Sequence, residues 1–341
     1  MQHSIPSKYT AASIAMLAAF ACAGPAMADP QPHVQAIDDE ETWSVSWEND
    51  VFAGADGNYT NGVRFAYVSS ENDVPHWLEN TANLLPFFAE EGAKRWELSL
   101  GQNMYTPENY NLRAAQPNDR PYAGWLYGSA GVTSDTGTTL DHFRITLGMV
   151  GPASGAEQVQ ETVHDFIGSP HPQGWQNQLD NEPGLMLSYQ RKWRNWWALN
   201  NEGFGLDLTP SAGATVGNII TQASAGAVVR IGEDLPADYG PPLIGSTLTG
   251  TDFFQPSTDL GWYLFAGLEG NAVARNIFLD GNTFSDSLSV DKKPLVGGAQ
   301  VGLAVTYRDV RYAYTHRFLS KEYDQQVGTS SYGAFTVSAK F

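Results

Sequence analysis

The sequence predicts an all-β fold, a transmembrane antiparallel β-barrel of about twelve strands with a short helix in an extracellular loop. Apolar and polar residues alternate in many segments of about ten residues, a pattern typical of strands with one apolar and one polar face. No stretch of about 18 or more apolar residues follows residue 28, so we expect no transmembrane helix. Tyr, Trp, Phe and Gly are abundant, and only 16% of residues are charged. A soluble β-sandwich is the alternative, and at this length it would need more than one domain.

The first 28 residues have the pattern of a secretory leader. Lys8 supplies the positive start, residues 11–23 form an Ala-rich apolar stretch, and an A-x-A cleavage site ends at Ala28. We therefore expect residues 1–28 to be removed and residues 29–341 to form one barrel domain in the outer membrane.

Composition limits the partners of the mature chain. Cys22 is the single cysteine and would leave with the leader, so we expect no disulfide to stabilise the fold. The formal net charge is −18 for the full chain and −19 once Lys8 leaves with the leader, which argues against a nucleic-acid partner. An anionic lipid would also be repelled unless a divalent cation bridged the like charges. Nothing in the sequence indicates an oligomer, and we expect a monomer.

Twelve segments carry the strand pattern, and an even number is what closed bacterial barrels require. In the last segment Phe335, Val337, Ala339 and Phe341 alternate with polar residues. An amphipathic strand that ends on a C-terminal Phe is similar to the assembly signal of bacterial outer-membrane barrels. The predicted strands are 43–48, 62–69, 95–103, 125–133, 141–150, 184–192, 204–213, 220–231, 261–271, 297–307, 310–319 and 332–341.

The connections between these strands should alternate between the two ends of the barrel. If the N-terminus starts in the periplasm, residues 49–61, 104–124 and 151–183 face outward, and these stretches are the richest in polar chemistry. Residues 70–94 then lie on the periplasmic side, and residues 232–260, rich in Pro and Gly, read as an irregular connection. In the periplasmic stretch a short amphipathic helix could pack under the barrel through Trp77, Leu78, Leu84, Leu85, Phe87 and Phe88.

The first outward connection begins with Asn49 and Asp50 at a strand end, followed by a Gly/Asn-rich turn over 56–62. Carboxamide and carboxylate oxygens in this position suit a hard cation or the orientation of a base. The alternative is turn chemistry, because Asn, Asp and Gly dominate turns.

The third outward connection contains a predicted helix over 157–168, with Gly168 as its C-cap. Gln160 and His164 are four residues apart and so share a face, and His is the natural general base near neutral pH. The alternative is an ordinary surface histidine. The apolar residues at helical spacing, which we expect to pack on the barrel, are Val159, Val163, Phe166 and Ile167.

The second outward connection contains two arginines, Arg113 and Arg120, that could meet phosphate or carboxylate. For Arg120 we favour an ion pair with Asp119 or Asp50 that orders the loop. Two further arginines are expected to form ion pairs inside the barrel, namely Arg64 and Arg144.

Together these motifs, in this order and spacing, resemble the lipid A 3'-O-deacylase family of Gram-negative outer membranes. The resemblance spans essentially the whole mature chain. The residues that carry it are Trp47-Glu48-Asn49-Asp50, Tyr59-Thr60-Asn61-Gly62, Tyr105-Thr106-Pro107, Asp119 to Trp125, Gly151-Pro152, Gln160, His164, Gly168, Gly174-Trp175-Gln176-Asn177-Gln178 and Phe278-Leu279-Asp280-Gly281-Asn282.

The resemblance implies a twelve-stranded outer-membrane barrel that removes the 3'-linked acyloxyacyl chain of lipid A with calcium. It places the active site between the barrel wall and the helix of an outer loop. It also implies functional roles for Asn49, Asp50, Thr60, Gln160 and His164.

Two positions depart from the family pattern. Pro170 stands where the family has a glutamate, and Leu112 followed by Arg113 stands where it has a lysine. Without that glutamate, Asp50, Asp56 or Glu161 would have to complete a metal site. We expect Arg113 to supply the lysine's charge toward the substrate.

The leading hypothesis is therefore ester hydrolysis. His164 would take a proton from water, and the hydroxide would attack the acyl carbonyl. Calcium near Asn49 and Asp50 would stabilise the oxyanion, while Gln160 and Thr60 orient water or substrate. The rivals are a serine-type outer-membrane phospholipase and a non-enzymatic barrel that acts as a pore or scaffold.

Overall fold

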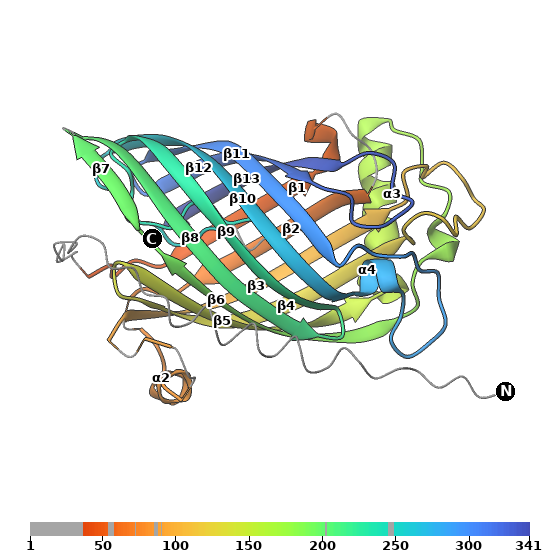
Figure 1. The fold of residues 1–341 in the computed structure, drawn as a ribbon, viewed down its shortest axis with the longest axis horizontal. Helices are drawn as coiled ribbons and strands as arrows, with labels where there is room; N and C mark the ends of the chain where they lie inside the picture. The colour runs from red at the N-terminus through yellow and green to blue at the C-terminus, as the bar shows by residue number, and fades with distance from the viewer. Residues whose placement is uncertain are drawn as a thin grey trace.

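A computed structural model describes residues 37–53, 58–71, 73–84, 88–89, 91–201, 203–244 and 249–341 (Figure 1). The predicted leader lies outside these residues, as does Asp56. None of the helices within them is long and apolar enough to cross a membrane.

Twelve antiparallel strands form a closed barrel, as predicted. Strands pair in the order β6-β5-β4-β3-β2-β1-β13-β12-β11-β10-β9-β8, and a pairing of β6 with β8 closes the ring. The strands are β1 (Thr42–Asn49), β2 (Asn58–Val68), β3 (Ala93–Thr106), β4 (Ala123–Asp135), β5 (Thr139–Val150), β6 (Glu182–Trp193), β8 (Phe204–Gly217), β9 (Ile220–Glu233), β10 (Leu260–Asn276), β11 (Leu295–Tyr307), β12 (Val310–Leu319) and β13 (Ser330–Lys340).

One further strand, β7 (Trp197–Asn201), was not predicted. It pairs with the first residues of β8, while β6 pairs with the remainder of that strand. β7 therefore prolongs one edge of the wall beyond the point where β6 ends, and it leaves the ring of twelve unchanged.

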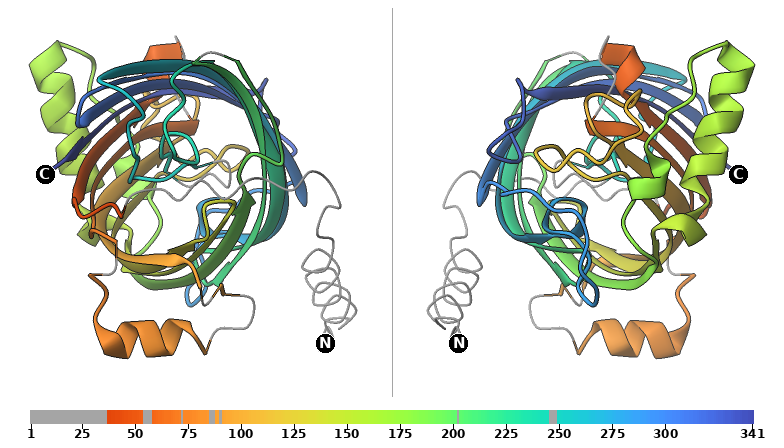
Figure 2. Two further views of the ribbon diagram at one scale, coloured as in Figure 1. Left: turned by 90° about the vertical axis from the view of Figure 1, so that its left-hand side faces the viewer. Right: turned by 90° about the vertical axis from the view of Figure 1, so that its right-hand side faces the viewer.

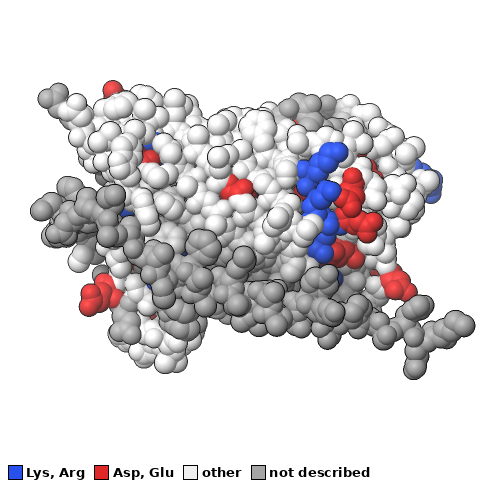
Figure 3. Space-filling view, in the orientation of Figure 1, with Lys and Arg blue, Asp and Glu red and all other residues white. Residues whose placement is uncertain are grey.

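The strands place apolar side chains on the outside of the barrel and polar side chains inside it, the reverse of a soluble protein. Trp43, Val45 and Trp47 of β1 are each about half exposed on the outside of the barrel, whereas Ser46 and Glu48 are buried inside it. Figure 3 shows the consequence, because few charged side chains lie over the strands on this face and most gather at one end. This is the surface that a lipid belt requires.

The lumen is filled by a connection that we call the lumen plug, residues 234–244 and 249–259 between β9 and β10 (Figure 2). Its Asp252 pairs with Arg64 of β2 at 2.7 Å, and its Asp238 pairs with Arg230 and Arg311. Ile244 of the plug donates its N–H to Glu48 Oε1, 2.7 Å away, so the plug reaches most of the way along the lumen. The stretch predicted as an irregular connection is thus a core element.

The predicted lumenal ion pairs are confirmed. Arg64 pairs with Asp252 at 2.7 Å, and Arg144 pairs with Glu97 of β3 at 2.7 Å. Both arginines point into the lumen, where they are partly or fully removed from water. A charge removed from water is costly unless an oppositely charged group lies close by.

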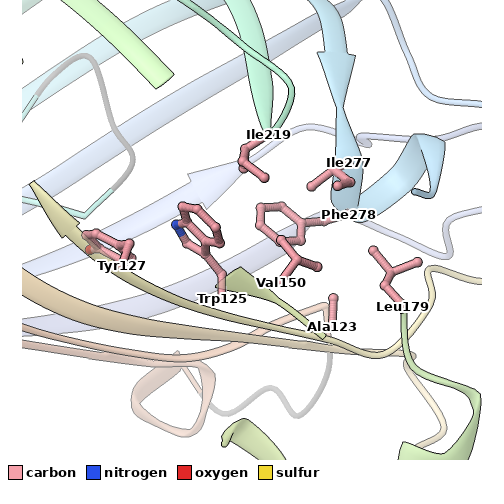
Figure 4. Close-up of a cluster of buried hydrophobic side chains, with 8 residues drawn as sticks. All are labelled: Ala123, Trp125, Tyr127, Val150, Leu179, Ile219, Ile277 and Phe278. Atoms are coloured by element: carbon pink, nitrogen blue, oxygen red, sulfur yellow. The ribbon is translucent and has the colours of Figure 1, made fainter. Parts of the chain in front are cut away.

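An apolar cluster lies inside the barrel at the end where β1 stops, and we call this end the outer end (Figure 4). Helix α4 (Ile277–Asp280) brings Phe278 into the cluster, where its ring stacks on Tyr105 at 4.1 Å. The members of this cluster, which we call the outer cap, are Ala123, Trp125, Tyr127, Val150, Leu179, Ile219, Ile277 and Phe278.

The connection between β2 and β3 contains the predicted helix, α2 (His76–Ala82), but its packing differs from the prediction. Trp77 and Leu84 are 70% and 83% exposed, and Figure 2 places α2 beside the barrel. Phe88 is buried as expected. Residues 85–87 lie outside the described part of the chain.

Candidate functional site

The candidate site lies on the outside of the wall at the outer end. Strand register places Asn49 opposite Asn61, Asn61 opposite Met104, and Met104 opposite Gly124. Neighbouring strands lie about 4.8 Å apart, so these four residues form a continuous row across β1 to β4. We call them the wall row.

Asn49 makes two side-chain hydrogen bonds at the end of β1. Its Nδ2 donates to Asn61 Oδ1 at 3.2 Å, and its Oδ1 accepts from the backbone N–H of Val51 at 2.9 Å. The second contact is the turn chemistry expected of Asn, and it starts the short helix η1 (Asp50–Ala53). Asp50, the first residue of η1, is buried.

Thr60 is placed by a β-bulge. The pairing of β2 with β3 shifts register between Tyr59 and Asn61, and a bulge re-aims the side chains around it. Thr60 is buried, and its hydroxyl shares a hydrogen bond with that of Thr106 at 2.8 Å. Thr60 therefore lies on the strand next to Asn49, one position from the wall row.

Helix α3 (Ala156–Ile167) confirms the predicted loop helix and ends at Gly168, whose φ of 70° suits the left-handed cap. Gly124 allows its close approach to the wall, because a Cβ there would lie 2.4 Å from the Ala156 Cβ. The buried residues that anchor the start of α3 to β3 and β4 are Met104, Tyr122, Ala156 and Trp175.

The face of α3 that meets the wall is not the predicted one. Gln160 is buried, and its Oε1 accepts from Trp175 Nε1 at 2.8 Å. Val159, Val163 and Phe166 are instead 40%, 44% and 91% exposed. The expectation that these apolar residues pack on the barrel is therefore wrong, and the side chain of Ile167 is not described.

His164 is held in one orientation by a backbone carbonyl. Its Nδ1 lies 2.6 Å from Pro170 O, and since a carbonyl can only accept, Nδ1 must carry the proton. In the neutral ring Nε2 is then the basic nitrogen. Next to it, His171 Nε2 lies 2.7 Å from Asp165 Oδ1, which ties the following loop back to α3.

Arg113 lies at the rim next to this loop. Its side chain is exposed, while its carbonyl accepts from Gln176 Nε2 at 2.5 Å and Asn177 Nδ2 at 2.9 Å. These contacts join the second outer loop to the third, which holds α3.

Arg120 forms an ion pair, as predicted, but not with Asp119 or Asp50. The guanidinium is buried and pairs with Glu322 at 3.3 Å, and only the backbone N–H of Arg120 contacts Asp119, at 2.7 Å. Arg120 orders the outer loops as expected, through a residue 202 positions away in the chain.

The structure thus brings Gln160 and His164, on a helix outside the wall, to the side of the barrel that carries Asn49 and Thr60 (Figure 2). The helix packs against β3 and β4, and Asn49 and Thr60 lie on the neighbouring β1 and β2. Arg113 stands at the edge of this arrangement.

A hard cation would find oxygen donors here. Asp50 offers a carboxylate and Asn49 a carboxamide oxygen, which is the donor chemistry that calcium prefers. In the described part of the chain no three His, Cys, Asp or Glu side chains group closely enough to hold a metal ion. The remaining ligands would have to be backbone carbonyls, water or substrate.

Three residues of the site carried no assigned role in the sequence prediction. Asn61 and Thr106 bond to Asn49 and Thr60, and Trp175 bonds to Gln160. All three belong to motifs visible in the sequence, but the bulge hides which of the β2 residues face outward. The contact of Pro170 with His164 could not be predicted, because it uses a backbone oxygen that every residue has.

Comparisons with known proteins identify the family and support the fold. A family model described as "Outer membrane protein LpxR" matches residues 13–341. The solved structure of LpxR from Salmonella typhimurium is similar in fold, with 21% identity, 88% of this chain and 100% of that chain covered, and a TM-score of 0.73. The β domain of the Bordetella autotransporter BrkA is 7% identical over 89% of this chain and 100% of that chain, with a TM-score of 0.43. No curated protein sequence matches the chain.

Proposed function

The chain belongs to the LpxR family of outer-membrane proteins, the lipid A 3'-O-deacylases, and from this premise we propose that it hydrolyses the 3'-linked acyloxyacyl ester of lipid A. Its location is the Gram-negative outer membrane. The observation that carries the proposal is the state of His164, whose Nδ1 is held by Pro170 O on a helix that faces the wall row.

In the proposed reaction His164 acts as general base and then as general acid. Nε2 takes a proton from water, and the hydroxide adds to the acyl carbonyl carbon. The tetrahedral intermediate collapses with cleavage of the ester C–O bond, and the sugar 3'-oxygen leaves with the proton from Nε2. Pro170 O holds the Nδ1–H throughout and stabilises the imidazolium, as the carboxylate of a catalytic triad does.

Gln160 and Thr60 would position water and substrate. The Gln160 Oε1 already accepts a hydrogen bond from Trp175. The N–H groups of the Gln160 Nε2 can therefore donate to a water or an oxyanion. The Thr60 hydroxyl is oriented by Thr106. Asn49 and Asp50 would hold calcium, which when bound supplies positive charge for the developing oxyanion.

We assign to Arg113 the binding of the substrate's negative charge. Its exposed side chain lies at the rim beside the loop of His164, and a guanidinium pairs well with a lipid A phosphate. The family's lysine is a point charge, so Arg113 would bind the same group with a different, bidentate geometry.

The rival functions receive less support. The lumen plug and the outer cap occupy the barrel from both ends, and cavities of about 170 and 120 Å³ between them are lined by Ile244 of the plug and Phe278 of the cap. A continuous pore is therefore disfavoured. Ser154, at the start of α3, donates its hydroxyl to Gly151 O at 2.6 Å, which is a structural role rather than that of a nucleophile.

The test is mass spectrometry of lipid A from cells that express wild type or His164→Ala, each with calcium or a chelator. We expect loss of one acyloxyacyl group only for wild type with calcium. His76→Ala is the control, because it removes an exposed histidine at the start of α2, away from the site, and should retain activity. Equal deacylation by His164→Ala would refute the mechanism, and unchanged lipid A in every sample, with folded barrel, would refute the function.

A further inference from the structure

Helix α3 lies across the barrel rather than along it. Figure 1 shows its axis roughly perpendicular to the long axis of the barrel, and Figure 2 shows it outside the ring. Because the barrel axis runs across the membrane, a helix perpendicular to that axis lies close to the membrane plane. This is the orientation of an interfacial amphipathic helix.

The side chains of α3 are segregated around its axis. Ala156 and Gln160 are buried against the wall. Successive residues turn by about 100°, so the other side chains fall on two edges beside this wall-facing line and on an outward side that carries Gln158 and Thr162. One edge, which we call the apolar edge, consists of Val159, Val163 and Phe166, and the opposite edge consists of Glu157, Glu161 and Asp165.

The wall beneath α3 is part of the lipid-facing belt. Met104 and Gly124 contact the start of the helix, and the next outward-facing positions along these strands include Leu100 of β3 and Leu126 of β4. These two leucines are 57% and 38% exposed. His164, on the other edge of α3, bonds to Pro170 O of the outer loop, so the apolar edge is turned the opposite way, toward these leucines.

We propose that α3 is an interfacial helix whose apolar edge lies in the acyl layer of the outer leaflet, with its acidic edge among the head groups. Phe166, which is 91% exposed, is then covered by lipid. The crevice between α3 and the wall opens directly onto acyl chains. The inference needs only that the strands span a membrane, so it stands apart from the proposed reaction.

The test uses single cysteines at Val163 and Phe166 on the apolar edge and at Glu161 and Asp165 on the acidic edge, each labelled with an NBD fluorophore. Cys22 is the single native cysteine, so wild type carried through the same labelling gives the background. The proteins are reconstituted in phosphatidylcholine vesicles that contain phosphatidylcholine with a doxyl group at acyl carbon 5.

We expect emission from positions 163 and 166 to be blue-shifted and quenched by the doxyl lipid, with little quenching at 161 and 165. Aqueous iodide should give the reverse order. Equal doxyl quenching at all four positions, or none at 163 and 166, would overturn the proposal. No substrate is turned over in this assay, so an inactive protein would leave its outcome unaffected.

Discussion

Substituting Gly124 with alanine should displace the helix that carries His164. A Cβ at Gly124 would lie 2.0 Å from Ser154 Oγ and 2.4 Å from the Ala156 Cβ. The Ser154 side chain is buried and bonded to Gly151 O, so it cannot simply rotate away. Carbon atoms pack at about 3.5–4.0 Å, and the start of α3 must therefore retreat by roughly 1 Å or more.

The expected cost of this overpacking is about 1–3 kcal/mol. A displacement of about 1 Å at a catalytic group can lower the rate by roughly 10²-fold. We therefore expect Gly124→Ala to fold and to reach the outer membrane, but to deacylate lipid A roughly 10²-fold more slowly than wild type. The assay is the time course of lipid A deacylation by mass spectrometry, with heat-modifiable gel mobility as the measure of folding.

Gly128→Ala is the matched control. It lies four residues further along β4, and its added Cβ would meet only Ser99 O, at the ordinary contact distance of 3.8 Å. We expect its activity to equal that of wild type. Wild-type activity in Gly124→Ala would refute the argument that α3 rests on this glycine, and equal losses in both variants would point to the strand instead.

Two further predictions concern the lumen plug and the acidic edge of α3. Asp238→Ala deprives the buried Arg230 and Arg311 of a shared carboxylate, so we expect a loss of about 3–5 kcal/mol in urea unfolding and increased conductance in planar bilayers. An unchanged conductance and midpoint would contradict the role of the plug. Burial, and next the neighbouring Glu161, raise the pKa of the Glu157 carboxyl. The folded state then binds the proton more tightly, so the stability of α3 is greatest below the ordinary pKa of about 4.5 and falls as pH rises through the raised value. Glu157→Gln should abolish this dependence in hydrogen exchange of the α3 amides, and a persisting dependence would assign it to another group.

The strands could be predicted because their signal is local. Each of the twelve predicted segments overlaps one barrel strand, since lipid on one side and a polar lumen on the other impose a period of two on every strand. β7 was missed because its five residues, Trp197–Asn201, are too few to show that period. The pairing of β6 with β8 also depends on the closure of the ring, which no single segment encodes.

The site residues were found as motifs, but their contacts were decided by the tertiary structure. Arg64 was predicted to form an ion pair, yet its partner Asp252 is 188 positions away and reaches it only because the lumen plug enters the barrel. Likewise Gln160 was predicted to share a face with His164, while the bond from Trp175 depends on how the loop after α3 folds back.

The sequence by itself determined that α3 is an amphipathic helix, and only the tertiary structure decided which side meets the wall. Helical spacing shows that Val159, Val163 and Phe166 share one side of α3, but not whether that side faces protein or the outside of the barrel. In a membrane protein the protein interior and the surrounding lipid are both apolar, so an apolar side of a helix can face either one. The small residues Gly124 and Ala156 decide the matter, because only there can the helix backbone come close to the strands.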